Sequence, residues 1–474
     1  MSAPRCQLVS VELYERPVRL RLPFRFGVVT LTAAPQAFVR ARIRLDDGRE
    51  GWGAGAELLA PKWFDKNLAL SNEDNFDQLR LALALARDAY RDGASRTAFG
   101  HFAAHYREVI DAGARRGLNA LVACFGPAQL DRAILDAFCR LGRMSFYEAI
   151  QGNLAGVAPA ELAPELAGFD VDAFLARLQP PDAIAARHTV GLVDAITGHP
   201  HQAADGLPES LAEVVTTYGH TWFKLKVGGK LDEDVERLKA IAAVLDASGA
   251  AYRASLDGNE QYDDLDALIA LWRRMQAEPE LARLVRSIAF IEQPIHRKHA
   301  LERDVSAVSR LTPLIIDESD ADLDALPRAR ALGYSGVSSK MCKGLYKSIL
   351  NAARCAVWSA GGKRYFMTGE DLTTQAGLAV QQDLALVNLL GITHVERNGH
   401  HYVNGMAQCP DTEQAAFLAA HPDLYERSHG AVRLKIRAGR LAIGSLGGIG
   451  FASGAEPDWR TLDAMPEPKL QEGR

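Results

Sequence analysis

The spacing of hydrophobic positions changes along the chain and divides it into regions. Apolar and polar residues alternate in short runs over residues 7–56, with the turn-forming Asp46-Asp47-Gly48 between two of them. This pattern predicts a small antiparallel sheet. Over residues 76–141 apolar residues recur at helical spacing instead, so we expect an N-terminal α+β domain.

A stretch rich in Ala and Pro at residues 155–186 is expected to hold one short helix and a linker. After it, apolar runs typical of strands alternate with helical patterns. The strands are expected near residues 188, 222, 252, 288, 313, 336, 364 and 392, with helices at 232–245, 263–275, 301–308, 323–332, 346–358 and 374–390. This alternation favours an α/β fold with a closed (β/α)8 barrel over a doubly wound sheet, whose dinucleotide fingerprint is missing.

We place the domains at residues 1–185 (N-terminal α+β domain), 186–402 (barrel) and 403–474 (C-terminal segment). Two short apolar runs around Ala438-Gly439-Arg440 predict a hairpin in the last segment. We expect that hairpin to pair with the N-terminal sheet.

Composition narrows the class of protein. The chain has 474 residues, 48% of them hydrophobic, and a formal net charge of −5 with no long basic block. This charge argues against nucleic acid as a partner and favours a small molecule. The six cysteines contain no C-x-x-C pair, which is typical of free thiols in a reducing, cytoplasmic setting. With no apolar run long enough for a membrane span and no leader-like segment, we expect a soluble protein without a membrane partner.

Charged residues end five successive apolar runs at intervals of about one strand plus one helix. They are Lys224-Leu-Lys226, Asp257-Gly-Asn259, Glu292-Gln-Pro294, Asp317-Glu-Ser319 and Lys340. In a (β/α)8 barrel the carboxyl ends of the strands carry the chemistry. The row therefore predicts one shared site.

The two lysines at the first of these strand ends point to the same face of their strand. Like charge and partial burial would lower a lysine's pKa and create a general base. The alternative is that Lys224 and Lys226 extend from an exposed edge strand. Lys340 follows the sixth strand, across the barrel from the second, and would place a lysine on the other side of a bound substrate. Its alternative role is a structural ion pair.

Asp257, Glu292 and Asp317 end three successive strands and would converge on one hard divalent cation. Oxygen ligands of this kind suit Mg²⁺, with Mn²⁺ as a second possibility. Taken singly, each carboxylate would more often cap the next helix or face solvent. Their recurrence at barrel spacing favours the metal site.

Together these motifs resemble the enolase superfamily, and within the mandelate racemase/muconate lactonizing enzyme family they are most similar to the muconate-lactonizing-enzyme (muconate cycloisomerase) subgroup. The resemblance implies that Asp257, Glu292 and Asp317 bind Mg²⁺ and that Lys226 and Lys340 are the acid/base pair. It further implies that Lys224, Asn259 and Glu396 contact the substrate, and that the N-terminal region and C-terminal segment form a capping domain. The alternative for Glu396 is a surface charge beside Arg397.

The implied reaction is removal of the α-proton of a carboxylate substrate to give a metal-stabilised enolate. The outcome is racemisation or epimerisation, or cycloisomerisation or β-elimination, and the sequence leaves these alternatives open, as it does a barrel that binds metal and carboxylate without turnover. No His occurs at residues 365–371, which disfavours the mandelate-racemase subgroup, and Glu396-Arg-Asn398 replaces the Asp-x-Asp of dipeptide epimerases. We also expect a homo-oligomer.

Two further features remain open. His394, His400 and His401 follow the last strand, and we interpret them as solvated or substrate-contacting rather than metal-binding. Lys62-Trp-Phe64 would be either a lid over an anionic substrate or a loop packed on its own domain.

Overall fold

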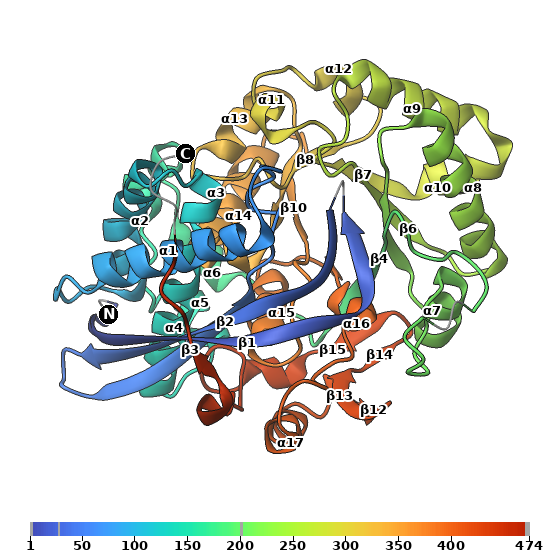
Figure 1. The fold of residues 1–474 in the computed structure, drawn as a ribbon. Helices are drawn as coiled ribbons and strands as arrows, with labels where there is room; N and C mark the ends of the chain where they lie inside the picture. Colours follow the sequence, from blue (N-terminus) through green and yellow to red (C-terminus); the bar gives the residue numbers. More distant parts are fainter. Residues whose placement is uncertain (1–2, 27–28, 200–201, 470–474) are drawn as a thin grey trace.

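The structure is a computed structural model and describes residues 3–26, 29–199 and 202–469. A long antiparallel hairpin crosses the front of the molecule, with helices on one side of it and a barrel on the other (Figure 1). Among the described residues, no helix has both the length and the apolar character needed to cross a membrane.

The N-terminal domain is built on a four-stranded sheet in the order β16-β1-β2-β3. Its strands are β1 (Cys6–Phe26), β2 (Val29–Leu45), β3 (Glu50–Leu58) and β16 (Asp463–Ala464). The helices that follow are α1 (Asn72–Tyr90), α2 (Ala98–Arg115), α3 (Ala120–Ala123), α4 (Phe125–Gly142), α5 (Phe146–Gln151) and α6 (Val171–Ala176). α4 lies directly on β3. The two backbones are so close that a Cβ added at Gly53 would come within 2.1 Å of the backbone nitrogen of Ala137, so only glycine fits there.

The predicted barrel is confirmed. Its parallel strands are β4 (Ala183–Val190), β5 (Trp222–Lys226), β6 (Arg253–Asp257), β7 (Ile288–Glu292), β8 (Leu314–Ile316), β9 (Gly336–Ser339), β10 (Phe366–Gly369) and β11 (His394–Glu396). β11 pairs with β4, so the sheet closes on itself.

Helices connect the barrel strands and cover the outside of the sheet (Figure 1). They are α7 (Leu211–Tyr218), α8 (Leu231–Ala247), α9 (Leu265–Ala277), α10 (Ala282–Ser287), α11 (Arg297–Ala300), α12 (Ser306–Ser309), α13 (Ala325–Ala331), α14 (Leu345–Ser359), α15 (Leu378–Leu389) and α16 (Gly399–Tyr402). The helix expected at 301–308 is instead the two short helices α11 and α12. The stretch 155–186 contains one short α-helix, α6, as expected, together with two 3-10 turns, Pro159–Glu161 and Pro164–Leu166.

The C-terminal segment contacts both parts of the molecule. It contains α17 (Asp411–Ala420), the hairpin β12 (Tyr425–Ser428) and β13 (Ala431–Leu434), and the hairpin β14 (Ile436–Arg437) and β15 (Arg440–Ala442). The prediction that the hairpin around Gly439 joins the N-terminal sheet is wrong, because β15 pairs with β4 of the barrel. Of the described part of this segment, only β16 returns to the N-terminal sheet, where Tyr14 and Ala464 are paired.

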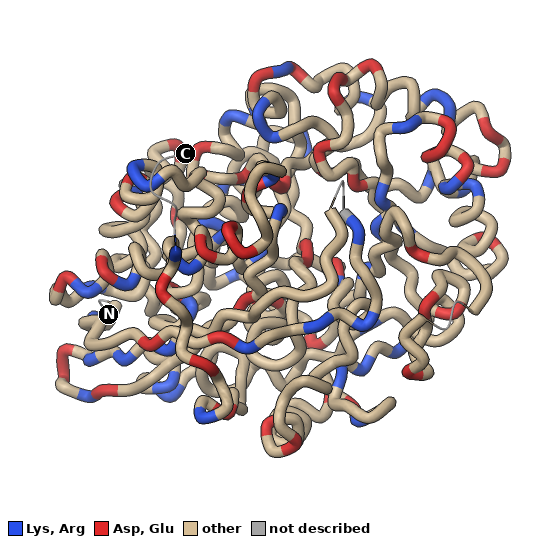
Figure 2. Tube along the Cα trace, viewed as in Figure 1, with Lys and Arg blue, Asp and Glu red and all other residues tan. Residues whose placement is uncertain are grey.

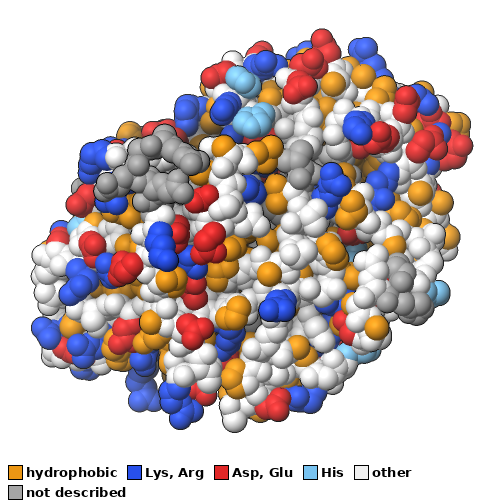
Figure 3. All heavy atoms as spheres, in the orientation of Figure 1, with side chains coloured by type: hydrophobic (Ala, Val, Ile, Leu, Met, Phe, Trp, Pro, Cys, Tyr) orange, Lys and Arg blue, Asp and Glu red, His pale blue; other side chains and the backbone are white. Residues whose placement is uncertain are grey.

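Charges of both signs are distributed along the whole trace (Figure 2). Acidic and basic side chains also alternate over the face shown in Figure 3, with no broad area of one sign among the described side chains there.

β5 illustrates how the sequence places the site. Phe223 and Leu225 point away from the barrel axis into the apolar layer between strands and helices. Lys224 and Lys226 alternate with them and are buried at the inner face, as the period of two predicts.

Candidate active site at the carboxyl ends of the barrel strands

The three predicted carboxylate ligands end three neighbouring strands. Asp257 and Glu292 are the last residues of β6 and β7, and Asp317 directly follows β8. Their exposed fractions are 0%, 0% and 1%. Buried carboxylates require cationic or hydrogen-bonding partners, so their contacts define the site.

Lys224 lies at the centre of the cluster. Its Nζ is 2.9 Å from Asp257 Oδ2, 2.8 Å from Glu292 Oε2, 2.8 Å from Glu370 Oε2 and 3.1 Å from Glu396 Oε2. Burial alone would lower the pKa of Lys224, but these carboxylates together raise it well above the ordinary value. The expectation of a lowered lysine pKa is therefore wrong for Lys224, since opposite charges surround it.

Lys226 and Lys340 line the same small cavity, of about 30 Å³. Lys226 Nζ lies 2.5 Å from Asp257 Oδ2, and Lys340 Nζ lies 2.7 Å from Asp317 Oδ2. Burial opposes the charge on Lys340, yet Asp317 outweighs it and raises the pKa of this lysine. Each lysine thus touches a different carboxylate of the row.

Asn259 and Glu396 also line this cavity. Glu396 accepts hydrogen bonds from the Thr189 hydroxyl at 2.5 Å and from the Asp371 backbone N–H at 2.8 Å. Asn259 Oδ1 is buried and has no hydrogen-bond partner. The structure therefore brings all the predicted lysines, together with Asp257, Asn259 and Glu396, to one cavity.

Three charged residues of the site had no predicted role. Glu370 follows β10, contacts Lys224 and accepts a hydrogen bond from the buried guanidinium of Arg187. Lys343 donates to the Ser338 hydroxyl at 2.8 Å and lies 3.4 Å from Asp317 Oδ1. Glu370 ends an apolar run as the predicted ligands do, so the same strand-end rule could have found it.

The loop between β3 and α1 covers the mouth of the barrel. Lys340 Nζ lies 4.2 Å from the centroid of the Trp63 ring, which lines the cavity. Arg297 donates to the backbone carbonyls of Trp63 and Phe64 at 2.8 and 3.0 Å, and Lys66 Nζ lies 2.5 Å from Glu260 Oε2. Of the two interpretations of residues 62–64, the structure supports the loop over the site.

Comparison with known proteins identifies the family of this fold. Residues 206–452 match the family model described as enolase C-terminal domain-like. The chain belongs to the enolase superfamily. A search of curated proteins finds no match to the sequence.

Solved structures of the enolase superfamily share the fold at low sequence identity. The dipeptide epimerase of Enterococcus faecalis, complexed with Mg and a dipeptide, is 16% identical, with a TM-score of 0.58 over 94% of this chain and 99% of that chain. The L-Ala-D/L-Glu epimerase of Bacillus subtilis is 17% identical, with a TM-score of 0.57 over 95% and 99%. The muconate lactonizing enzyme of Mycobacterium smegmatis is 19% identical, with a TM-score of 0.55 over 95% and 98%.

The enolase-superfamily carboxylates here fit a hard cation by their chemistry. Burial, and then the neighbouring Asp257 and Glu370, raise the pKa of Glu292 well above its ordinary value. Glu292 Oε2 is buried without a hydrogen bond, although Lys224 Nζ is near it. This excess of buried oxygen donors suits a divalent cation. Among the described residues, however, only a group of histidines has three possible ligand atoms all within 4.8 Å of one another. The oxygens of the three carboxylates therefore lie farther apart than those ligand atoms do.

The histidines near the end of the barrel are not part of the cavity lining, and two of them are buried. His400 and His401 are buried, with exposed fractions of 7% and 4%, and neither lines the cavity. His394 stacks on Trp222 at the start of β5, with ring centroids 3.7 Å apart. The interpretation of His400 and His401 as solvated or substrate-contacting is therefore wrong.

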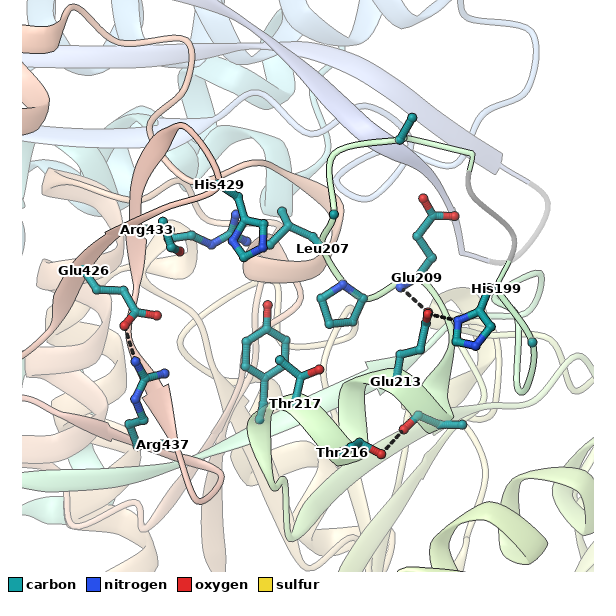
Figure 4. A pocket seen from close by; sticks show the side chains of 17 residues that line it. His199, Leu207, Glu209, Glu213, Thr216, Thr217, Glu426, His429, Arg433 and Arg437 are labelled. Carbon is teal, nitrogen blue, oxygen red and sulfur yellow. Dashed lines mark hydrogen bonds and ion pairs between the residues drawn. The ribbon is translucent and has the colours of Figure 1, made fainter.

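A surface pocket of about 730 Å³ lies away from the carboxylates. It is bordered by α7, by the segment around Leu207 and by the β12–β13 hairpin, with Arg433 on one wall and Glu213 on the other (Figure 4). Two of its charged side chains, those of Glu426 and Arg437, form an ion pair. The small cavity, rather than this pocket, is lined by the predicted lysines and by Asp257.

Proposed function

We propose that this protein is a Mg²⁺-dependent enzyme that removes the α-proton of a carboxylate substrate to form an enolate. The observation that carries the proposal is that Lys226 and Lys340, from opposite sides of the barrel, line one enclosed cavity. Each also contacts a carboxylate of the predicted metal-binding row. A base and an acid on opposite faces of one carbon acid are what proton removal and return require.

Asp257, Glu292 and Asp317 would hold the Mg²⁺. When bound, the cation supplies electrostatic stabilisation to the negative charge that develops on the substrate carboxylate. The excess negative charge felt by Glu292 supports this assignment.

The remaining residues bind and enclose the substrate. Lys224 stays protonated in its carboxylate surroundings and offers an ammonium group to the substrate carboxylate. Asn259, with its unpartnered Oδ1, and Glu396 lie beside it. Trp63 covers Lys340 and excludes water, which strengthens each of these interactions.

Either lysine can act as base, with the other returning a proton or assisting a leaving group. Reprotonation gives racemisation or epimerisation, whereas loss of a β-substituent or ring closure gives dehydration or cycloisomerisation. All these outcomes use the same two lysines. The family includes epimerases and a muconate lactonizing enzyme among the structures similar to this chain.

Exchange of the α-proton in D₂O tests the proposal. The protein is incubated with Mg²⁺ and a panel of hydroxy acids, N-acyl amino acids and dipeptides, and deuterium incorporation is followed by NMR. We expect exchange with at least one acid and its loss when EDTA is added. Absence of exchange across the panel would favour a barrel that binds metal and carboxylate without turnover.

Substitution of Lys226 and Lys340 shows which lysine acts on which face of the substrate's α-carbon. We expect Lys340→Ala and Lys226→Ala each to lower exchange from one face by about 10²-fold or more, the usual contribution of a general acid or base, while Mg²⁺ affinity is retained. Lys239→Ala removes a lysine on α8 that pairs with Glu278 outside the cavity, and it serves as the matched control. Undiminished exchange in Lys340→Ala would refute the two-lysine model.

A further inference from the structure

Three buried histidines from distant parts of the sequence meet on the outer side of the barrel. His188 lies in β4, His220 lies two residues before β5, and His400 lies in α16. Their exposed fractions are 2%, 3% and 7%. Arg187 and Thr189 point inward to Glu370 and Glu396, so the alternation of the strand directs His188 to the opposite face. The histidines are therefore separate from the carboxylate cluster.

The three rings form a nearly equilateral triangle. Ring centroids are 5.4 Å apart for His188 and His220, 5.5 Å for His188 and His400, and 5.4 Å for His220 and His400. One possible ligand nitrogen from each ring lies within 4.8 Å of the other two. With metal–nitrogen bonds of about 2.1 Å and tetrahedral angles, three imidazoles on one ion have centroids about 5 Å apart.

The ring nitrogens lack the partners that buried polar atoms need. His220 Nδ1 lies 2.8 Å from the Ala186 carbonyl oxygen, and this contact makes Nδ1 the donor and leaves the lone pair on Nε2. His220 Nε2 and His188 Nδ1 are buried without a hydrogen bond, and the His400 ring has no described hydrogen-bond partner other than the backbone of Arg397. A backbone carbonyl that orients one nitrogen while the other binds metal is the usual arrangement of histidine ligands.

The electrostatic surroundings keep the rings neutral. Burial, and then the neighbouring histidines, hold the pKa of His188 well below its ordinary value, and burial lowers that of His220 to about 4. Burial also holds the pKa of His400 well below the ordinary value. Neutral imidazole is the form that binds a metal ion.

We propose that His188, His220 and His400 form a second metal site, which binds one transition-metal ion of the Zn²⁺ type and fastens α16 to the outer face of β4. Imidazole nitrogens select such ions over Mg²⁺, which prefers oxygen ligands. The ion would join the first barrel strand to the segment that follows the last one. Three protein ligands leave the fourth tetrahedral position for water.

The large surface pocket gives the ion a route. Tyr218 borders that pocket, and its ring centroid lies 5.8 Å from that of His220 and 5.4 Å from that of His400. Tyr218 therefore adjoins both the histidine site and the open pocket whose wall carries Arg433 (Figure 4). Small rotations of Tyr218 would admit the ion.

Zinc binding is tested on the full-length, metal-stripped protein in saturating Mg²⁺, so that the carboxylate row does not contribute. Zn²⁺ is titrated against a chelating dye, and Co²⁺ is used in parallel for its tetrahedral absorption bands. We expect one Zn²⁺ per chain, a tetrahedral Co²⁺ spectrum and a higher unfolding temperature with Zn²⁺. Absence of Zn²⁺ binding under these conditions would overturn the proposal.

Two variants remove ligand atoms with little other change. His220→Asn keeps an N–H donor for the Ala186 carbonyl and lacks Nε2, and His400→Gln removes a ring whose one described hydrogen-bond partner is the Arg397 backbone. We expect each to weaken Zn²⁺ binding by at least about 100-fold and to abolish the Co²⁺ bands. The control His299→Gln changes an exposed histidine on α11 and should bind as wild type does. Wild-type affinity in both ligand variants would refute the assignment, and circular dichroism shows that each variant is folded.

Discussion

Lys224 contacts four carboxylates with one ammonium group, and these contacts set the charge state of the lysine. The sequence correctly placed Lys224 and Lys226 on the inner face of β5, because alternation in a strand is strict. The predicted lowering of the pKa of Lys224 was wrong, because that prediction considered only the charges within β5. The decisive charges of Asp257, Glu292, Glu370 and Glu396 come from four other strand ends.

Glu370 is the residue whose removal we expect to be most costly to stability. In Glu370→Gln, the buried Arg187 and Lys224 lose a charged partner. The loss of one partner from a buried ion pair costs about 3 kcal/mol or more. Urea unfolding followed by circular dichroism measures the change in the free energy of unfolding.

Glu233→Gln is the matched control for this substitution. Glu233 pairs with Lys230, and both side chains are largely exposed, at 73% and 71%. An exposed pair contributes about 0–1 kcal/mol. A loss in Glu370→Gln no larger than in this control would contradict the role given to Glu370.

At the scale of elements, the positions of strands and helices could be predicted from hydrophobic periodicity, whereas the elements that each one packs against could not. The hairpin around Gly439 was predicted from its apolar runs and turn, yet it joins β4 rather than the N-terminal sheet. A hairpin pattern defines two strands and leaves the identity of the third open. The loop bearing Trp63 likewise could be located in the sequence, but its contact with Arg297 depends on the docking of two domains.

Arg297 holds this loop over the barrel by a forked contact. Its two terminal nitrogens reach the carbonyls of Trp63 and Phe64 while Nε pairs with Glu260. In Arg297→Lys the charge remains but the fork is lost. Each lost hydrogen bond is worth about 1 kcal/mol, so we expect amide hydrogen exchange in residues 59–67 to become roughly tenfold faster or more.

Hydrogen exchange with mass spectrometry checks this result at peptide resolution. Arg303→Lys provides the control, because the exposed Arg303 contacts only the Asp263 carbonyl among the hydrogen bonds described. Unchanged exchange of residues 59–67 in Arg297→Lys would show that other contacts hold the loop.

At the scale of the whole molecule, the barrel could be predicted because each βα step leaves a local signature. The cluster of His188, His220 and His400 could not, because its members are scattered along the chain without the short spacing of a metal motif. Such a site exists only once the first and last strands have met.

Buried histidines also make the stability of the whole fold depend on pH. Burial lowers the pKa of His101 from 6.5 to about 4. In the unfolded chain this ring takes up a proton below about 6.5, while the folded protein does not until about 4, so stability falls as the pH drops through that window. The effect of one such group is at most roughly 3 kcal/mol.

His101→Gln isolates this contribution. Gln can still donate to the Cys6 carbonyl, which His101 Nε2 contacts at 2.8 Å, but it does not titrate. We expect the unfolding midpoints of wild type and variant, measured in urea at pH 7, 6 and 5, to converge or cross as the pH falls. Parallel profiles would exclude His101 as a contributor.

The pairing of β15 with β4 has a consequence for the order in which the protein is made. A nascent chain that has emerged from the ribosome through Tyr402 possesses all eight barrel strands. Ala183 and Ile184 nevertheless find their partners only when Ala442 and Leu441 appear. The N-terminal end of β4 therefore lacks this strand partner while about forty more residues are synthesised. Chaperones that protect open sheet edges would act on this protein during that interval.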